Sequence, residues 1–299
     1  MNTIIKIINN RNTLLVTALI LGLAIGKADF LKPYTLLVLA IVMVFSTTSF
    51  DFKILKDYKY FAKSTLSALL LNYVIFDTIV LGLAYFMVKD QNLWWGYVVI
   101  AATPPGVAIV PFSYIFKSDT NYSLIGIIGV YLLSIVLTPL IIELFVQDAD
   151  INIWQLIKVT LEVILVPILL SRLLIIKRIK PVTEKIRGKV VNWGFAIIIY
   201  TVIALNRDVI FSDLKVVLTA SFIFFVAMFV AGFVFEKIYK NKKPRDLRIS
   251  QNLMLTIKSS GFAAGTALSV FGVESALPAA IMAVFVILYL IVASFVFAR

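Results

Sequence analysis

A polar break inside a long apolar run constrains this chain more than any other feature. The run from Ile249 to Phe271 is long enough to span a bilayer, yet residues 256–265 read Thr-Ile-Lys-Ser-Ser-Gly-Phe-Ala-Ala-Gly. Lipid offers no hydrogen bonds to a loosened backbone, so we expect protein or a cavity around this break. Lys258 adds an insertion cost of roughly 2.5–3.5 kcal/mol at that depth. A charged residue that is retained in spite of this insertion cost usually has a functional role.

A second break lies in an earlier apolar run, from Trp94 to Phe116, which Thr103-Pro104-Pro105-Gly106 interrupts. Aligning Gly106 with Gly261 gives an offset of 155 residues, which also aligns Ala108 with Ala263, Phe116 with Phe271 and Asp119 with Glu274. Paired interruptions of this kind are the best sequence indicator of a transporter's midplane binding site. The alternative interpretation is a proline kink and a glycine packing contact, both common in membrane helices.

The composition indicates an all-α integral membrane protein. Hydrophobic residues make up 61% of the 299 positions, and the mean hydropathy is +1.01. Repeated apolar runs predict ten transmembrane helices, the first of them a retained span and not a cleaved signal. The expected spans are about 12–28, 34–50, 61–87, 94–116, 122–145, 153–176, 188–206, 214–236, 249–271 and 275–298.

Basic residues predict the orientation of these spans. With the N-terminus inside, cytoplasmic segments hold 20 Lys and Arg residues and outer loops hold five. We therefore expect a cell-membrane protein with both termini cytoplasmic. The acidic loop 143–150 separates two five-span halves, 1–150 and 151–299. An odd number of spans inverts the second half, so the broken fourth and ninth spans are expected to cross.

Several function classes are poorly supported. The chain has no Cys and no His, which leaves no thiolate or imidazole ligand for zinc and no histidine base. The net charge of +12 fits loops that face anionic lipid better than it fits nucleic acid. We expect no enzyme activity, no cofactor and no metal site.

Three polar side chains within the spans are candidates for function. Lys258 is the foremost, although a buried ion pair or a position nearer the interface would also explain it. Asp77 and Asn72 lie in the third span, where Asp77 needs a partner such as a lysine or hydroxyl of the other broken helix, or serves as a structural anchor. Lys158 and Glu162 are spaced to pair with each other.

These stretches resemble the bile acid:sodium symporter family. Thr103–Ala108, Phe116–Asp119 and Leu137–Leu140 are similar to that family's fourth and fifth spans, and Ser259–Ala263 and Leu277–Ile281 to its ninth and tenth. The resemblance implies a core subdomain that carries the crossed helices and a panel subdomain, each drawing helices from both halves. The two would move against each other in alternating access.

The sequence departs from the family at the positions that the resemblance implies as sodium ligands. A Glu and a Gln of the ninth span are replaced by Met254 and Lys258, and a Ser-Asn pair of the fourth span by Ile109 and Val110. Asn72 stands where the family has a ligand Gln in the third span. Sodium coupling through side chains without oxygen is not expected, because hard cations need several oxygen ligands.

The combined prediction is a sodium-independent secondary transporter of a small organic anion, with the lipid bilayer as its surroundings. Lys258 would replace the bound cation, supported by Asn72 and Asp77, while Thr103, Pro104, Pro105, Gly106, Ser259, Ser260 and Gly261 form the crossover that binds substrate. Two alternatives remain: a transporter resembling auxin efflux carriers, and a membrane sensor that binds a ligand without moving it.

Overall fold

The computed structural model describes residues 11–48, 57–146, 158 and 161–297, and these residues form helices and no strand. The first half comprises α2 (Arg11–Ile25), η1 (Lys32–Tyr34), α3 (Thr35–Thr47), α4 (Tyr58–Leu69), η3 (Leu70–Phe76), α5 (Asp77–Met87), α6 (Gln91–Ala102), α7 (Ile109–Ile115) and α8 (Thr120–Phe145). The second comprises η4 (Leu161–Leu165), α10 (Val166–Leu174), α11 (Lys180–Leu205), α12 (Arg207–Ser212), α13 (Leu214–Phe224), η5 (Phe225–Val230), α14 (Ala231–Tyr239), α15 (Arg245–Thr256), α16 (Ser260–Val270) and α17 (Val273–Phe297).

Within the part of the chain that the structure describes, five uninterrupted helical stretches are long and apolar enough to cross a membrane: Tyr58–Met87, Thr120–Phe145, Lys180–Leu205, Leu214–Tyr239 and Val273–Phe297. The all-α membrane class predicted from the sequence is therefore confirmed. Each of the ten expected spans contains helix within the described residues, with 94–116 and 249–271 interrupted. Part of 153–176 and of the acidic loop 143–150 falls outside the described residues.

Aspartates determine where four of the helices begin. The side chains of Asp57, Asp90, Asp119 and Asp213 each accept a hydrogen bond from a backbone N–H three residues later. These bonds satisfy donors that the first turn of a helix leaves without a partner. The caps position α4, α6, α8 and α13 at the polar ends of apolar runs.

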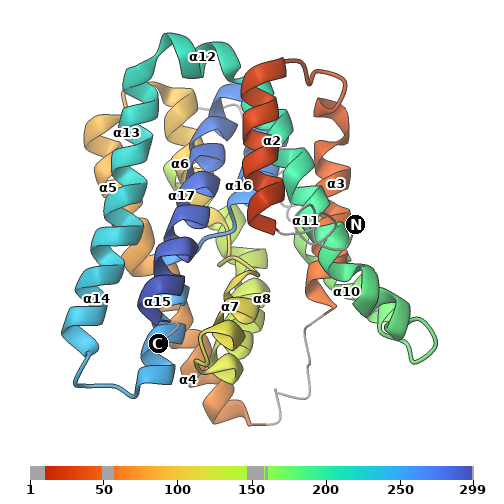
Figure 1. Ribbon diagram of the computed structural model, residues 1–299, viewed down its shortest axis with the longest axis vertical. Coiled ribbons are helices and arrows are strands. Elements are labelled where there is room, and N and C mark those ends of the chain that lie inside the picture. The colour runs from red at the N-terminus through yellow and green to blue at the C-terminus, as the bar shows by residue number, and fades with distance from the viewer. Residues whose placement is uncertain (1–10, 49–56, 147–157, 159–160, 298–299) are drawn as a thin grey trace.

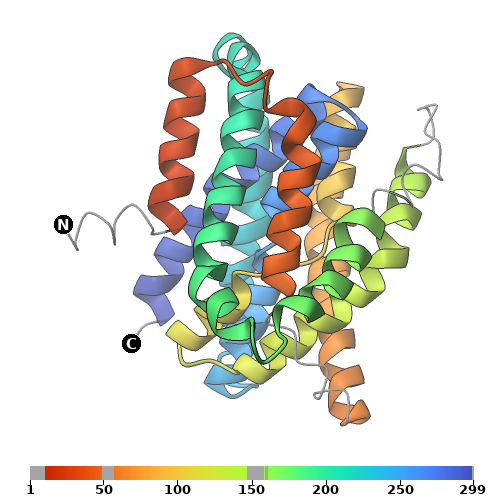
Figure 2. The same ribbon diagram turned by 90° about the vertical axis from the view of Figure 1, so that its right-hand side faces the viewer.

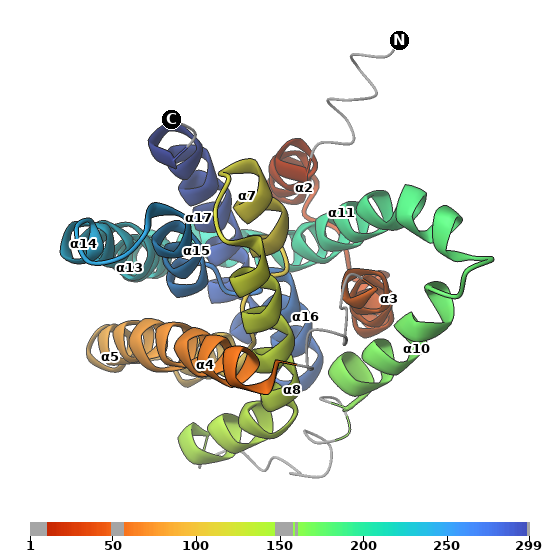
Figure 3. The ribbon, with the colours of Figure 1, turned by 90° about the horizontal axis from the view of Figure 1, so that it is seen from below.

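The helices pack as two sets. In the first set, α11 packs against α2 and α3, and α10 packs against α3. The second set contains α4–α8 and α13–α17, in which α4 lies against α8 and α6 against α17. Seen from below, the first set lies on one side of α16 and the α13–α14 and α4–α5 rods lie on the other (Figure 3). A view from the side shows α2, α3 and α11 running alongside one another (Figure 2).

Helix α16 lies at the centre of the molecule, between α17 and α6 of its own set and α3 and α11 of the other (Figure 1). All of its residues from Ser260 to Leu268 are buried. Its small side chains permit this close surrounding, because Gly261, Ala263, Ala264, Gly265 and Ala267 present little volume to their neighbours.

Candidate functional site

The two apolar runs singled out in the sequence are both broken, and the breaks lie against each other. Helix α6 ends at Ala102 and α7 begins at Ile109, while α15 ends at Thr256 and α16 begins at Ser260. Gly106 N donates to Ile257 O at 3.0 Å, and Ser259 N donates to Pro104 O at 3.2 Å. Pro105 and Lys258 thereby form an antiparallel bridge. Backbone groups freed at one break are satisfied by the other, as an apolar environment requires.

Local sequence explains why the first run breaks at this point. Thr103 precedes a proline, which disfavours the helical region, and its backbone is extended with φ −84° and ψ 150°. The prolines at 104 and 105 have no N–H to continue a helix. A side chain at Gly106 would place its Cβ 3.0 Å from Ile257 Cγ2 and 3.1 Å from Lys258 O. Glycine therefore allows the two backbones to approach.

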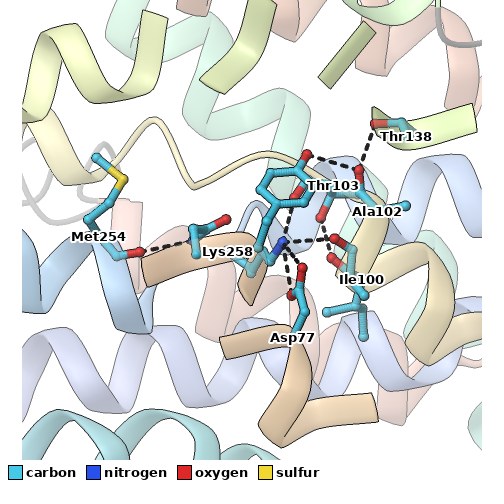
Figure 4. Close-up of polar contacts among 10 residues, drawn as sticks. Asp77, Ile100, Ala102, Thr103, Thr138, Met254 and Lys258 are labelled. Carbon is cyan, nitrogen blue, oxygen red and sulfur yellow. Dashed lines mark hydrogen bonds and ion pairs between the residues drawn. The ribbon is translucent and has the colours of Figure 1, made fainter. Parts of the chain in front are cut away.

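The Lys258 ammonium is buried at the crossing point, with 1% of the residue exposed (Figure 4). Its Nζ lies 3.0 and 3.1 Å from the two carboxylate oxygens of Asp77. It also donates to Ala101 O at 2.9 Å and Thr103 O at 2.8 Å, and lies 4.0 Å from the centroid of the Tyr73 ring. Four oxygens and one aromatic face thus surround a single cation, and the charge of Asp77 balances it.

The end of α6 is satisfied by side chains from three other elements. Lys258 reaches the carbonyls of Ala101 and Thr103, and Ala102 O accepts from Tyr73 Oη at 3.1 Å and from Thr138 Oγ1 at 2.6 Å. A cation at a helix C-terminus is favourable because the partial charge there is negative. The ammonium therefore stabilises the carbonyl groups at the break in addition to the Asp77 carboxylate.

The third span comprises α4, η3 and α5, and its polar side chains lie on or directly after the π-helical segment η3. Asn72 Nδ2 donates to Met254 O at 2.9 Å, Tyr73 lies under the ammonium, and Asp77 pairs with it. Hydrogen bonds in a π-helix join residues five apart, so residues at this spacing lie on nearly the same side. The widened turn directs Asn72 toward the end of α15 and Asp77 toward Lys258 in the break that follows it. Asn72 contacts the end of α15 and not the ammonium.

A small pocket adjoins the crossing on the side of the other helix set. Gly106, Val107 and the residues 258–261 line it from one set, and Leu15 of α2 with Phe195 and Ile199 of α11 line it from the other. Gly261 lies against Phe195 so closely that an added Cβ would be 2.1 Å from Phe195 Cδ1. The breaks therefore face the boundary between the two sets.

Comparison with known proteins identifies the family to which this chain belongs. A family model described as the sodium bile acid symporter family matches residues 36–213, more than half of the chain. The chain belongs to this family. It is accordingly a multi-pass membrane protein of a transporter family, and the resemblance inferred from the motifs is confirmed at that level. A search of curated protein sequences finds no match. The matched region of this symporter-family chain includes the first break and Asp77, and it ends before Lys258.

The crossover residues expected from the sequence are all found at this site. One non-helical segment of the crossing consists of Thr103, Pro104, Pro105 and Gly106. The other segment and the start of α16 consist of Lys258, Ser259, Ser260 and Gly261. The predicted pair of Lys158 and Glu162 lies elsewhere, with 3.9 Å between Nζ and Oε1 and side chains that are 75% and 44% exposed. That pair is remote from the candidate site.

Two contributors were missed by the sequence reasoning. Tyr73 contacts the ammonium with its ring and α6 with its hydroxyl, and the Thr138 hydroxyl donates to Ala102 O at the end of α6. Tyr73 could have been identified from the sequence, because it precedes Asp77 by four residues and therefore lies on the same side of a helix as Asp77. Nothing in the local sequence of Thr138 identifies Ala102 as its partner.

Proposed function

We propose that this protein is a sodium-independent secondary transporter of a small organic anion that works by alternating access. Lys258 takes the place of the bound cation in this proposal. The observation that carries it is the enclosure of the Lys258 ammonium by Asp77, Ala101 O and Thr103 O at 2.8–3.1 Å. Family membership supports transport, and this cluster supports the manner of coupling.

The oxygen cluster argues against a sodium ion bound at the same point. An ammonium already occupies the centre of these oxygens, and two cations a few ångströms apart in a weakly screened interior repel strongly. Met254 and Ile109, at positions where the resemblance implies sodium ligands, are fully buried and carry no side-chain oxygen. The residues at this site therefore fit the Lys258 ammonium better than they fit a transported sodium ion.

Ten spans in two inverted repeats, 1–150 and 151–299, form the scaffold of the proposed transporter. The 155-residue offset relates more than the breaks: the π-helical segments η3 and η5 begin at Leu70 and Phe225, which are also 155 residues apart. Asp57 and Asp213, which cap the helices leading into these segments, agree with the offset within one residue. This correspondence supports a duplicated five-helix unit.

The two helix sets correspond to the subdomains that alternating access requires. The set of α2, α3, α10 and α11 would form the panel, and the set that holds the crossover would form the core. The pocket between Gly261 and Phe195 is nearly closed in this conformation, with a volume of about 10 Å³, and it is our candidate substrate site because it has one wall from each set. Relative movement of the sets would open this pocket to one side and then to the other.

Recognition of an anion there is assigned to the start of α16. The Lys258 ammonium has its donors engaged by Asp77 and two carbonyls, so it does not offer them to a substrate in this conformation. Helix α16 begins at Ser260, and Ser259 makes no side-chain cap. Ser260 N already donates to Lys258 O at 3.1 Å, so the N–H groups of Gly261 and Phe262, together with the positive end of the helix dipole, are the ones assigned to a carboxylate in the pocket.

Orientation follows from the basic residues. The α14–α15 connection and the C-terminal end of α17 lie at the lower end of the molecule in Figure 1. Lys237, Lys240 and Arg245 lie at this end, which we assign to the cytoplasm of a cell-membrane protein. Both termini are proposed to be cytoplasmic.

Counterflow in liposomes tests the proposal. Purified protein is reconstituted, vesicles are loaded with steroid carboxylates or short keto acids, and uptake of labelled compound is followed with sodium or choline as the external cation. We expect exchange that does not depend on sodium. Lys258→Gln should abolish it, whereas Lys63→Gln, which changes an exposed lysine of α4, should leave it unchanged.

Three results would contradict parts of this proposal. Uptake that rises with external sodium would refute the replacement of the cation. Full exchange by the Lys258→Gln variant would refute the role of the lysine. Saturable binding without exchange would instead favour the membrane sensor, since a sensor binds its ligand without moving it.

A further inference from the structure

A second and larger pocket lies at the basic end of the molecule, away from the crossover. It has a volume of about 690 Å³ and is bounded by α14, α15 and α17. These three helices lie close together when the molecule is viewed from that end (Figure 3). None of the residues that form the candidate substrate site lines this pocket.

Its lining is divided into an apolar wall and a basic rim. The wall is formed by Phe229, Phe233, Val292 and Val296, of which Phe233 is 69% and Val296 60% exposed. The rim carries four cations and one carboxylate: Lys237, Lys240, Arg245, Arg248 and Glu236. A ligand with an anionic group and a hydrocarbon portion matches both parts.

Among the described residues that line the pocket, one carboxylate stands against four basic side chains. Glu236 Oε2 accepts from Arg248 Nε at 2.7 Å and neutralises it. Lys237 and Lys240 are exposed on α14 and its C-terminal cap, and Arg245 Nη2 donates to the carbonyl of Phe297. Lys243 is directed elsewhere, because its Nζ donates to Gln251 Oε1 at 2.6 Å and lies 4.2 Å from the Tyr239 ring. Among the described lining residues, Lys237 and Lys240 therefore give the mouth an excess of positive charge.

The two parts lie at the depths where a bilayer places a headgroup and its chains. Lys237 and Lys240 lie at the end of the apolar helical stretch Leu214–Tyr239, and Phe233 lies one turn deeper. Val296 lies in the last turn of Val273–Phe297. Basic side chains at this level attract anionic headgroups, and apolar side chains below them contact acyl chains.

The floor of the pocket offers little to a wholly polar ligand. Tyr289 Oη and the Asn252 side-chain oxygen are hydrogen-bonded to each other, and Asn252 Nδ2 donates to Gly232 O at 2.9 Å. The polar groups at the floor are therefore already paired. A small hydrophilic anion would find its charge partners only at the rim, while a lipid would also fill the apolar part.

We propose that the pocket between α14, α15 and α17 binds an anionic phospholipid, whose phosphate lies among Lys237, Lys240 and Arg245 and whose acyl chain lies along Phe233 and Val296. The site is independent of the proposed transport mechanism, since it does not include the crossover.

Lipid titration of the purified full-length chain tests this site. Thermal stabilisation in a neutral detergent is measured against added phosphatidylglycerol, phosphatidylcholine with the same acyl chains, and glycerol phosphate. We expect phosphatidylglycerol to stabilise the parent protein and the other two to have little effect. The Lys237→Gln/Lys240→Gln variant should bind phosphatidylglycerol about 30-fold more weakly, which corresponds to about 1 kcal/mol for each basic residue.

Two further variants separate this site from general effects. Lys185→Gln/Lys189→Gln removes the same charge from exposed positions of α11 and should retain the parent affinity. Val296→Trp keeps the basic rim but fills the apolar wall, and it should weaken phosphatidylglycerol binding. Equal stabilisation by the two lipids, equal losses in the two lysine pairs, or equal binding of glycerol phosphate would overturn the proposal.

Discussion

Replacing Lys258 with methionine tests the central contact of the molecule. Methionine retains an unbranched apolar stem, so the change removes the ammonium while preserving much of the packing. It leaves the Asp77 carboxylate and the carbonyls of Ala101 and Thr103 without their donor in a site where the lysine is 1% exposed. The Asp77 carboxylate is then a buried charge without a partner.

The expected loss follows from the geometry. Removing one partner of a buried ion pair typically costs about 3–5 kcal/mol, because the remaining charge is uncompensated. Asp77→Asn should cost less, about 1–3 kcal/mol, since the ammonium keeps two carbonyl acceptors and the Tyr73 ring. The double variant has no unpaired charge, so its loss should be about 2–3 kcal/mol smaller than the sum of the single losses.

Equilibrium unfolding in mixed micelles, followed by the fluorescence of the four tryptophans, measures these losses. Lys158→Met is the matched control, because it breaks an ion pair of 3.9 Å whose lysine side chain is 75% exposed. That variant should lose less than about 0.5 kcal/mol. Additive losses at Asp77 and Lys258, or a Lys258→Met variant as stable as the control, would refute the coupling that we infer.

Three further outcomes are expected. Lys258→Ala vacates the centre of the oxygen cluster, so 100 mM sodium chloride but not choline chloride should stabilise that variant by about 1–2 kcal/mol, and the parent should not respond. Gly261→Ala should abolish counterflow because its Cβ would lie 2.1 Å from Phe195 Cδ1, whereas Gly188→Ala, with nothing within 4 Å, should stabilise α11 by up to about 1 kcal/mol and keep transport. Tyr73→Phe removes the hydroxyl and its bond to Ala102 O and should cost about 1 kcal/mol in micelle unfolding, and a loss above about 3 kcal/mol would contradict our assignment.

Much of the fold could be predicted because local sequence patterns determine it. Apolar runs of bilayer length give the helices, and proline and glycine within two of those runs give the breaks. The extent of η3 and η5 was not predictable in the same way. A π-helical segment changes the direction of the side chains after it, and apolar sequences such as Leu70–Phe76 carry no distinctive signal for it.

The candidate site was only partly predictable for a physical reason. A buried charge must have a partner, so the sequence indicated that Lys258 and Asp77 each needed one. Which groups complete the site depends on how helices pack across more than a hundred residues of sequence. The carbonyls of Ala101 and Thr103 become ligands only because α6 ends there and the second break lies over its end.

These contacts also specify where the proposed transporter can move. Lys258 connects the second break to α5 and α6, and the backbone bonds at Gly106 and Ser259 tie the two breaks together, all within one helix set. Opening the crossover would separate a buried ion pair and several hydrogen bonds at once. The boundary with the other set is different, because Phe195 and Gly261 meet there through packing, and the Asn206 Nδ2 bond to Val273 O, at 2.9 Å, lies at the end of α11. Alternating access should therefore move the crossover as a rigid unit past α11, with that contact sliding and the ion pair intact.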